Sequence, residues 1–150
     1  MLAGSPFFPT AFKNGAFSVS LNQRNGRRGS VDFLANIGMI AYGALPSCML
    51  IRKTMEVCSD YACAFNKLAN DTMIASGYFI LAGVKDNEGV VISRDRTASA
   101  DIATISDDHW NLVQTNEDHF ADICLERCEA ARNNFQKLTR EALTIETGFN

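Results

Sequence analysis

The sequence has few histidines and little excess charge of either sign. Only two of its 150 residues are histidine, and 14 Lys and Arg against 17 Asp and Glu give a formal net charge of −3. Such a charge creates no global positive field of the kind that attracts nucleic acid or an anionic membrane. No apolar run reaches the roughly 18 residues that a membrane-spanning helix needs. We therefore expect neither nucleic-acid binding nor a transmembrane segment.

The sequence also lacks the cysteine spacing of a disulfide scaffold or a zinc site. Its cysteines are odd in number and include no Cys-x-x-Cys pair; they are Cys48, Cys58, Cys63, Cys124 and Cys128. This pattern, with so few histidines, favours neither a disulfide framework nor a metal site. We interpret Cys58 and Cys63 as small buried apolar residues at a helix junction, and we leave their pairing open.

What is present is a globular composition, with 47% apolar and 21% charged residues, in a length that suits one domain. Residues 15–21 alternate apolar and serine side chains, which predicts a strand. A helix is predicted to begin at Ser30 and to end near Gly43. Because apolar residues recur along it at helical spacing, we expect it to be a core helix. Two further helices are predicted over residues 47–57 and from residue 59 or 60 to 69.

The second half of the chain has the pattern of an antiparallel sheet. A meander of four strands is predicted over residues 77–84, 89–95, 100–105 and 110–116, and a hairpin turn joins the first two. Helices are predicted over residues 121–134 and 139–147. Helical and strand segments in this order predict an α+β fold, in which helices cover one face of an antiparallel sheet.

Few of the polar residues form a recognisable catalytic group. Residues 107–109, Asp-Asp-His, lie in one predicted turn, which is more typical of a solvated hairpin tip than of a catalytic pair. A nucleophilic cysteine with a nearby base is a second hypothesis, from Cys124 or Cys128 with His119. Asn116, at the end of a predicted strand, can donate a hydrogen bond to a developing oxyanion, but asparagine there is also a common turn former.

Four segments stand in an informative order and spacing. They are Leu50-Ile-Arg-Lys-Thr-Met-Glu, Tyr78-Phe-Ile-Leu-Ala-Gly-Val, Glu88-Gly-Val-Val-Ile-Ser-Arg-Asp-Arg and Val113-Gln-Thr-Asn-Glu-Asp-His-Phe. The last two, about twenty residues apart, are the most specific combination. Together the segments closely resemble the acid ceramidase and N-acylethanolamine acid amidase family, and the similarity runs from about Phe12 to Arg132.

The resemblance implies an N-terminal-nucleophile hydrolase with a four-layer αββα fold, of which residues 1–150 would form a single partial domain. It implies acyl transfer through a thioester on a cysteine that self-cleavage exposes. The substrate would be ceramide or an N-acylethanolamine, and the choice between them stays open. It implies no metal or organic cofactor, and residence in the lysosome. A glycosylation sequon at Asn70-Asp-Thr is compatible with that location, although a helix-ending turn explains it equally well.

The resemblance also implies roles for three residues. Asn116 matches an asparagine that supports the oxyanion, with Glu117 in place of the family's usual tyrosine. Arg127 resembles the first arginine of an Asp-Asp-Arg-Arg segment, whose second arginine is here Cys128. Gln23 stands where acid ceramidases carry a functional glutamate, so the position keeps a polar acceptor and loses its capacity for acid–base chemistry.

The family's nucleophile has no counterpart here. Neither its cysteine nor the Gly-Arg-x-x-Asp-Phe segment that follows it precedes Phe12, and none of the five cysteines aligns with it. We therefore expect a C-terminal-side portion of the catalytic β subunit, which needs the N-terminal part or α subunit of the same precursor as its partner and is inactive alone. The alternative is a non-catalytic domain, or pseudoenzyme, that binds an acyl lipid or a partner subunit.

Overall fold

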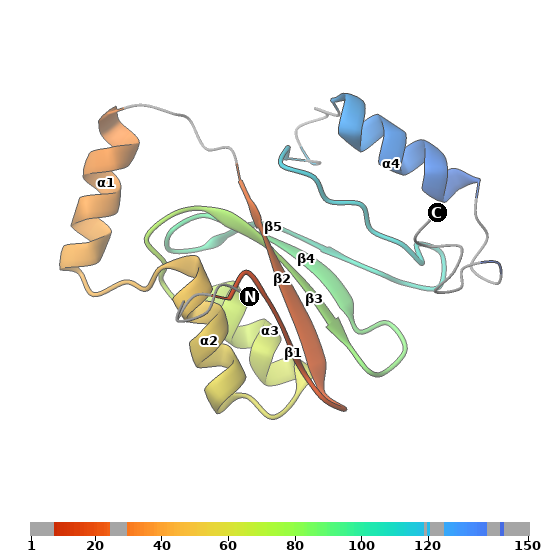
Figure 1. The fold of residues 1–150 in the computed structure, drawn as a ribbon, viewed down its shortest axis with the longest axis horizontal. Coiled ribbons are helices and arrows are strands. Elements are labelled where there is room, and N and C mark those ends of the chain that lie inside the picture. Colours follow the sequence, from red (N-terminus) through yellow and green to blue (C-terminus); the bar gives the residue numbers. More distant parts are fainter. Residues whose placement is uncertain (1–7, 25–29, 119, 121–124, 138–141, 143–150) are drawn as a thin grey trace.

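The computed structural model describes residues 8–24, 30–118, 120, 125–137 and 142. In this part of the chain, a five-stranded antiparallel sheet has the order β1-β2-β3-β4-β5, so that each strand lies beside its neighbour in the sequence (Figure 1). The strands are β1 (Thr10–Lys13), β2 (Phe17–Gln23), β3 (Gly77–Gly83), β4 (Gly89–Arg94) and β5 (Ser99–Thr104). The helices are α1 (Ser30–Ala41), α2 (Ser47–Val57), α3 (Tyr61–Asn70) and α4 (Glu126–Gln136).

Helices α2 and α3 pack on one face of the sheet (Figure 1). Leu50 and Ile51 of α2 and Leu68 of α3 are fully buried, as are Phe79 and Ile92 on the strands that they face. Complete burial of a side chain of this kind stabilises the fold by about 1.5–3 kcal/mol. These contacts form the main hydrophobic core of the described residues.

A buried arginine joins α3 to the sheet. Arg94, the last residue of β4, is fully buried, and its guanidinium donates to the carbonyl oxygens of Leu68 at 2.5 Å and Asp71 at 2.6 Å. Burial lowers the pKa of Arg94, while the nearby carboxylate of Asp71 opposes that change. The side chain thus satisfies carbonyl groups that the end of a helix leaves without intrahelical partners.

Residues 110–118 and α4 lie over part of the other face of the sheet (Figure 1). The strand register places Tyr78, Val91 and Ala103 on this face. Val91 lies opposite Ala103, and Tyr78 lies opposite Ser93, which is two residues from Val91 on the same strand. The segment that approaches them is irregular. The predicted strand over residues 110–116 is therefore wrong: the main chain is extended over the sheet without joining its hydrogen-bonded ladder.

The other predicted strands and the two helices that became α2 and α3 are confirmed, with shifts at their ends. Strand β1 was not predicted from the sequence. Helix α4 begins at Glu126, later than the predicted start at residue 121, and residues 121–124 lie outside the described part. The helix predicted over residues 139–147 also lies outside the described residues, apart from residue 142 in a turn.

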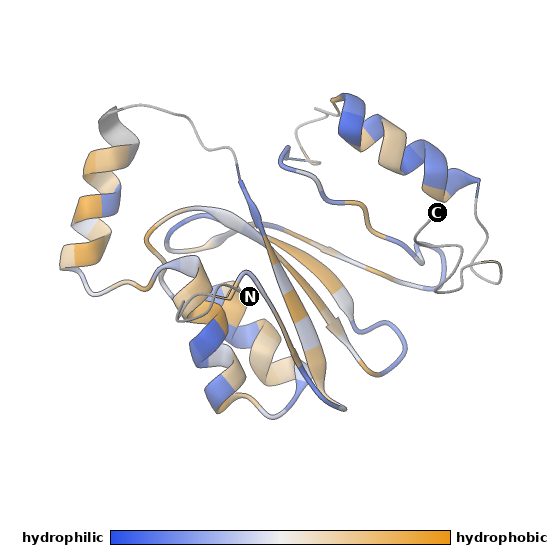
Figure 2. Ribbon diagram, viewed as in Figure 1, coloured by the Kyte–Doolittle hydropathy of each residue, from blue (hydrophilic) through white to orange (hydrophobic). Residues whose placement is uncertain are grey.

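Helix α1 forms where the sequence predicts it, but the prediction that it is a core helix is wrong. Its apolar side chains are largely exposed, with Phe33 and Leu34 each 66% exposed and Ile40 59% exposed. The helix projects from the sheet, and its apolar residues are visible in Figure 2. Arg96 links it to the sheet by donating to the Asn36 side chain at 2.8 and 3.0 Å. Helical periodicity identifies an apolar face but not the surface that covers it.

The interpretation of the cysteines is also corrected. Cys58 and Cys63 form a disulfide between the end of α2 and the start of α3, with their Cα atoms 5.4 Å apart. Cys128 is disulfide-bonded as well, whereas Cys48 is a free cysteine. The close pairing arises because the chain reverses direction between two antiparallel helices, which the linear spacing does not reveal. No helix in the described part of the chain is long and apolar enough to cross a membrane.

Candidate functional site

One end of the sheet gathers polar side chains from distant parts of the chain. The end of β2 lies beside the start of β3, with Gln23 opposite Gly77, and Gly77 in turn lies opposite Arg94 at the end of β4. Residues 114–118 pass over the same end of the sheet. Side chains that flank these three strands are therefore brought together although up to 94 residues separate them in sequence.

Arg24, the residue after β2, is the centre of an ion-pair cluster. Its Nε and Nη2 donate to the two carboxylate oxygens of Asp118 at 2.6 and 2.9 Å, a bidentate arrangement. Its Nη1 donates to Asp95 at 2.6 Å. The Arg24 side chain is only 10% exposed. A two-pronged contact of this kind fixes orientation as well as distance, because the planar guanidinium matches the carboxylate.

Tyr78 adds a neutral donor to the same carboxylate. The side chain is fully buried, and its hydroxyl donates to Asp118 Oδ1 at 2.6 Å. Burial, followed by the hydrogen bond to Asp118, raises the pKa of Tyr78 above its ordinary value. The hydroxyl thus keeps its proton and remains a donor at neutral pH. The pKa of Arg24 is also raised, chiefly by its hydrogen bond to Asp118.

Two aromatic rings lie against the arginine. The guanidinium carbon of Arg24 is 5.9 Å from the ring centre of Tyr78 and 5.6 Å from that of Phe120. A cation over an aromatic face at this distance is attracted by the ring quadrupole and is partly shielded from water.

Three consecutive residues, the last two of β2 and Arg24 after it, contact three alternate residues of the loop. Asn22 Nδ2 donates to the carbonyl of Gln114 at 3.2 Å, and Asn116 Nδ2 donates to the carbonyl of Gln23 at 2.8 Å. The bidentate pair between Arg24 and Asp118 completes the set. Asn116 is thus held directly, and the loop is anchored through the main chain of Gln114, two residues before it, and through the side chain of Asp118, two residues after it.

The loop is also bonded to itself. Gln114 Nε2 donates to the carbonyl oxygens of Thr115 at 3.1 Å and Glu117 at 2.9 Å, and the Thr115 hydroxyl donates to the Glu117 carboxylate. These bonds compensate for the absence of a neighbouring strand. The segment therefore has a defined shape without being part of the sheet.

The three residues singled out by the family resemblance lie together. Arg127 Nη2, on α4, donates to Asn116 Oδ1 at 3.1 Å, while the Asn116 amide nitrogen donates to Gln23. Gln23 accepts this hydrogen bond through its main-chain carbonyl, whereas the family resemblance concerned its side chain. An amide nitrogen carries two N–H groups, and the bond to Gln23 uses one of them.

The other sequence candidates lie elsewhere. His109 closes a turn through its main-chain N–H, which donates to Ser106, and Asp107 and Asp108 are exposed beside it, so these residues form a solvated turn, although no strand follows in the described part of the chain to make it a hairpin tip. Cys128 is in a disulfide and has no thiol with which to act as a nucleophile, so that part of the cysteine–histidine hypothesis is wrong. His119 and Cys124 lie outside the described residues.

Sequence reasoning assigned no role to Arg24, Tyr78, Asp95 or Asp118. The signal was nevertheless present, because Tyr78, Asp95 and Asp118 all belong to the segments that carry the family resemblance, and Arg24 follows Leu21-Asn-Gln. Sequence motifs far apart in the chain that meet at one point of a fold are typical of a functional site.

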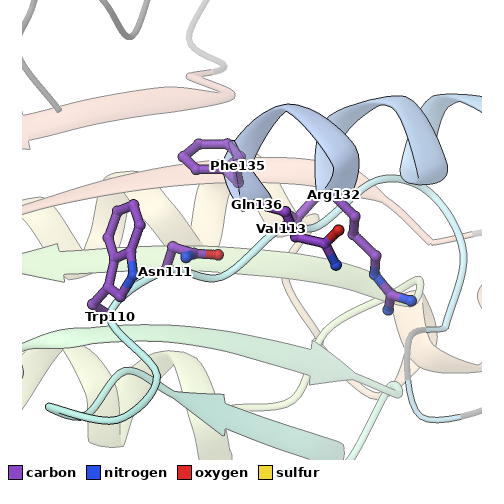
Figure 3. A pocket seen from close by; sticks show the side chains of 6 residues that line it. All are labelled: Trp110, Asn111, Val113, Arg132, Phe135 and Gln136. Carbon is purple, nitrogen blue, oxygen red and sulfur yellow. The ribbon is translucent and has the colours of Figure 1, made fainter. Parts of the chain in front are cut away.

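A cavity opens beside this loop. A cavity of about 310 Å³ lies between residues 110–113 and α4, and Figure 3 shows the side chains that line it. The Trp110 and Phe135 rings meet edge to face there, with centres 6.4 Å apart. A second hollow of about 300 Å³ shares Asn111, Val113 and Arg132 with it and reaches Gln114. Among the described residues, no group of three or more His, Cys, Asp or Glu side chains is arranged to hold a metal ion.

Comparisons with known proteins agree with the motifs. No family model matches the chain. The acid ceramidase of Heterocephalus glaber is 32% identical over 142 residues, covering 92% of this chain and 36% of that protein. The N-acylethanolamine-hydrolyzing acid amidase of Caenorhabditis elegans is 36% identical over 115 residues, covering 74% of this chain and 31% of that protein. The chain thus spans about a third of the length of these curated relatives.

A solved structure shares the fold. The Caenorhabditis elegans N-acylethanolamine-hydrolyzing acid amidase ortholog superposes with a TM-score of 0.84 and 28% sequence identity, over 97% of this chain and 62% of that one. The predicted resemblance and the predicted α+β class, an antiparallel sheet with flanking helices, are both confirmed.

Proposed function

Since this chain belongs to the acid ceramidase and N-acylethanolamine acid amidase family, we propose that it forms part of a cysteine amidase. The reaction is hydrolysis of the amide bond of ceramide or of an N-acylethanolamine, which releases a fatty acid and either sphingosine or ethanolamine. One observation carries the proposal: Asn116, the residue matched to the oxyanion-supporting asparagine, is held between Gln23 and Arg127 where the family motifs converge.

In the proposed mechanism, Asn116 stabilises the charge that develops on the substrate carbonyl oxygen. Attack of a cysteine thiolate on the amide carbon gives a tetrahedral oxyanion, and an N–H of Asn116 donates to it. The C–N bond then breaks, the leaving amine takes up the proton that the nucleophile's α-amine removed from the thiol, and a thioester remains. Water hydrolyses the thioester to the fatty acid and returns the thiol. Arg127 donates to Asn116 Oδ1, and this polarises the amide so that its N–H groups become stronger donors. Gln23 orients the same amide through its carbonyl oxygen.

The nucleophile of this mechanism is not supplied by the cysteines described here. Cys58, Cys63 and Cys128 are in disulfides, and Cys48 lies at the start of α2. The family's nucleophile is an N-terminal cysteine whose own α-amine acts as the base. We therefore expect these 150 residues to act together with the nucleophile-bearing part of the same precursor, and to hydrolyse no amide without it.

We further propose that the protein passes through the secretory route to the lysosome. The disulfide between Cys58 and Cys63 is typical of proteins that fold in an oxidising compartment. The sequon residue Asn70 is exposed at the end of α3, where an oligosaccharide could be attached. The bond from Asn70 Nδ2 to the Asn66 carbonyl at 2.8 Å is an ordinary surface contact that would be exchanged for water.

A second candidate function is favoured by the exposed apolar face of α1. Phe33, Leu34 and Ile40 are all exposed on this helix. Folded proteins rarely leave a group of large apolar side chains exposed together unless the surface binds something. A non-catalytic domain that binds an acyl lipid or a partner subunit would have such a surface. This candidate requires no cysteine nucleophile and predicts binding without turnover.

The test begins with the full-length transcript that encodes these residues. The encoded polypeptide and the 150-residue chain are each assayed for release of the fluorophore from a fatty-acyl arylamide, beside the Asn116→Ala and Asn66→Ala variants. We expect turnover only from the longer polypeptide, a loss of about 10²–10³-fold in kcat for Asn116→Ala, and full activity for Asn66→Ala. Asn66 is an exposed asparagine on α3 and serves as the matched control.

Two results would overturn the proposal. If Asn116→Ala retains the activity of the wild type, the residue does not support the oxyanion. If no polypeptide that contains these residues cleaves the amide but the 150-residue chain binds it, the non-catalytic candidate replaces the amidase.

A further inference from the structure

The mechanism proposed above assigns no role to the ion-pair cluster around Arg24. Arg24, Tyr78 and Asp118 are closely bonded to one another beside Asn116, and the hydrogen bonds described here for Asn116 go to Gln23 and Arg127 instead. Burying a charged side chain to this degree is costly unless its partners are closely matched. The cluster meets that condition, since the carboxylate of Asp118 receives three donors from two side chains.

The position of the cluster along the chain is informative. Asp118 lies two residues after Asn116, and Gln114, held by Asn22, lies two residues before it. The two anchors come from the residues on either side of Gln23, which accepts the hydrogen bond of Asn116. A loop fixed on both sides of one side chain leaves that side chain few orientations.

We propose that Arg24, Tyr78 and Asp118 form a positioning network that holds Asn116, and with it Arg127, in the geometry needed to support the oxyanion. The inference rests on the proposed function, because it names residues that act on the same site through Asn116. Asp95 belongs to the network as the second partner of Arg24, and it is itself fixed by the bond from its main-chain N–H to the Ala98 carbonyl at 2.9 Å.

Each member of the network has a distinct physical task. Arg24 joins three segments, the ends of β2 and β4 and the loop, through its five-donor fork, which a lysine could not reproduce. Tyr78 donates to Asp118 from β3, so the carboxylate is held by a second side chain besides Arg24. The rings of Tyr78 and Phe120 add cation–π attraction to the guanidinium, whose carbon lies 5.9 and 5.6 Å from their centres.

The experiment separates positioning from folding. In the longer polypeptide, Arg24→Lys keeps the charge and loses the bidentate fork, and we expect kcat to fall about 100-fold with KM little changed, as for a misplacement of about 1 Å. Tyr78→Phe removes only one hydroxyl from a buried ring, and we expect a fall of about tenfold. Arg52→Lys, at an exposed arginine paired with Glu56 on α2, is the matched control and leaves kcat unchanged.

The decisive readout is the double variant Arg24→Lys with Asn116→Ala. If Arg24 acts through Asn116, its substitution costs no further activity once Asn116 is alanine, so the two losses do not multiply. The inference would be overturned if the two losses in kcat multiply in the double variant. It would also be overturned if the single variants lower thermal stability while kcat stays at the wild-type value. Tyr78→Phe provides this comparison if Arg24→Lys does not fold.

Failure of the proposed function is distinguishable from failure of the inference. If the wild type cleaves no amide, the inference is tested by nuclear magnetic resonance of the 150-residue chain. The side-chain amide resonances of Asn116, assigned by their loss in Asn116→Ala, report whether this side chain is held in place. We expect them to be distinct from those of exposed amides in the wild type and in Arg52→Lys, and to move to the free-amide position in Arg24→Lys. Unchanged resonances in Arg24→Lys would overturn the positioning network itself.

Discussion

The disulfide between Cys58 and Cys63 should contribute measurably to stability. It joins residues only five positions apart, so the loop that it closes in the unfolded chain is short. The chain-entropy relation for a loop of this length gives about 2 kcal/mol at 25 °C. For a domain of 150 residues, this corresponds to about 4–8 °C in the midpoint of thermal unfolding.

The perturbation is the double variant Cys58→Ala with Cys63→Ala, which removes the cross-link without leaving a free thiol. Urea unfolding followed by circular dichroism measures the free energy of unfolding, and Cys48→Ala, at a free cysteine, is the control for the substitution itself. Cys58 is fully buried, so loss of its sulfur adds to the effect rather than opposing it. An unfolding free energy equal to that of the wild type, at the same dependence on urea, would refute the reasoning.

Two further predictions concern buried polar groups. Arg94→Ala removes the donors of the Leu68 and Asp71 carbonyl groups, and we expect a loss of roughly 3 kcal/mol or more in the free energy of unfolding, measured by urea titration against Arg52→Ala. The pKa of Tyr78 is raised in the folded state. Its contribution to the free energy of unfolding is therefore complete below the pKa of about 10 that tyrosine has in the unfolded chain, and it is lost progressively as the pH rises above that value. Unfolding measured from pH 8 to 11 should therefore show a steeper loss of stability in the wild type than in Tyr78→Phe, and parallel curves would contradict it.

Local patterns were sufficient to predict most of the secondary structure. The helices that became α2 and α3 and the strands that became β2 to β5 each have a period set by their own backbone geometry, so a short window of sequence reveals them. The family resemblance identified Asn116, Arg127 and Gln23, and the fold brings them within hydrogen-bonding distance. Strand β1 was missed because its four residues are too short to establish a period.

The errors have a common physical cause. Residues 110–116 have a strand-like pattern, but they bond to side chains and to themselves because no strand lies beside them. Helix α1 has an apolar face, and whether a face is covered depends on segments elsewhere in the molecule. In each case, the pattern described the segment correctly and the surroundings decided its packing.

By itself, the sequence determined the α+β class, the positions of most elements and the family to which the chain belongs, because periodicity and motif order are properties of the chain. Only the tertiary structure decided that Arg24 meets Asp95, 71 residues away, and Asp118, 94 residues away. It also decided that the main-chain carbonyl of Gln23 accepts the hydrogen bond of Asn116 and that Cys58 pairs with Cys63. These contacts depend on strand register and on the reversal of the chain between helices, which arise from packing over long sequence separations.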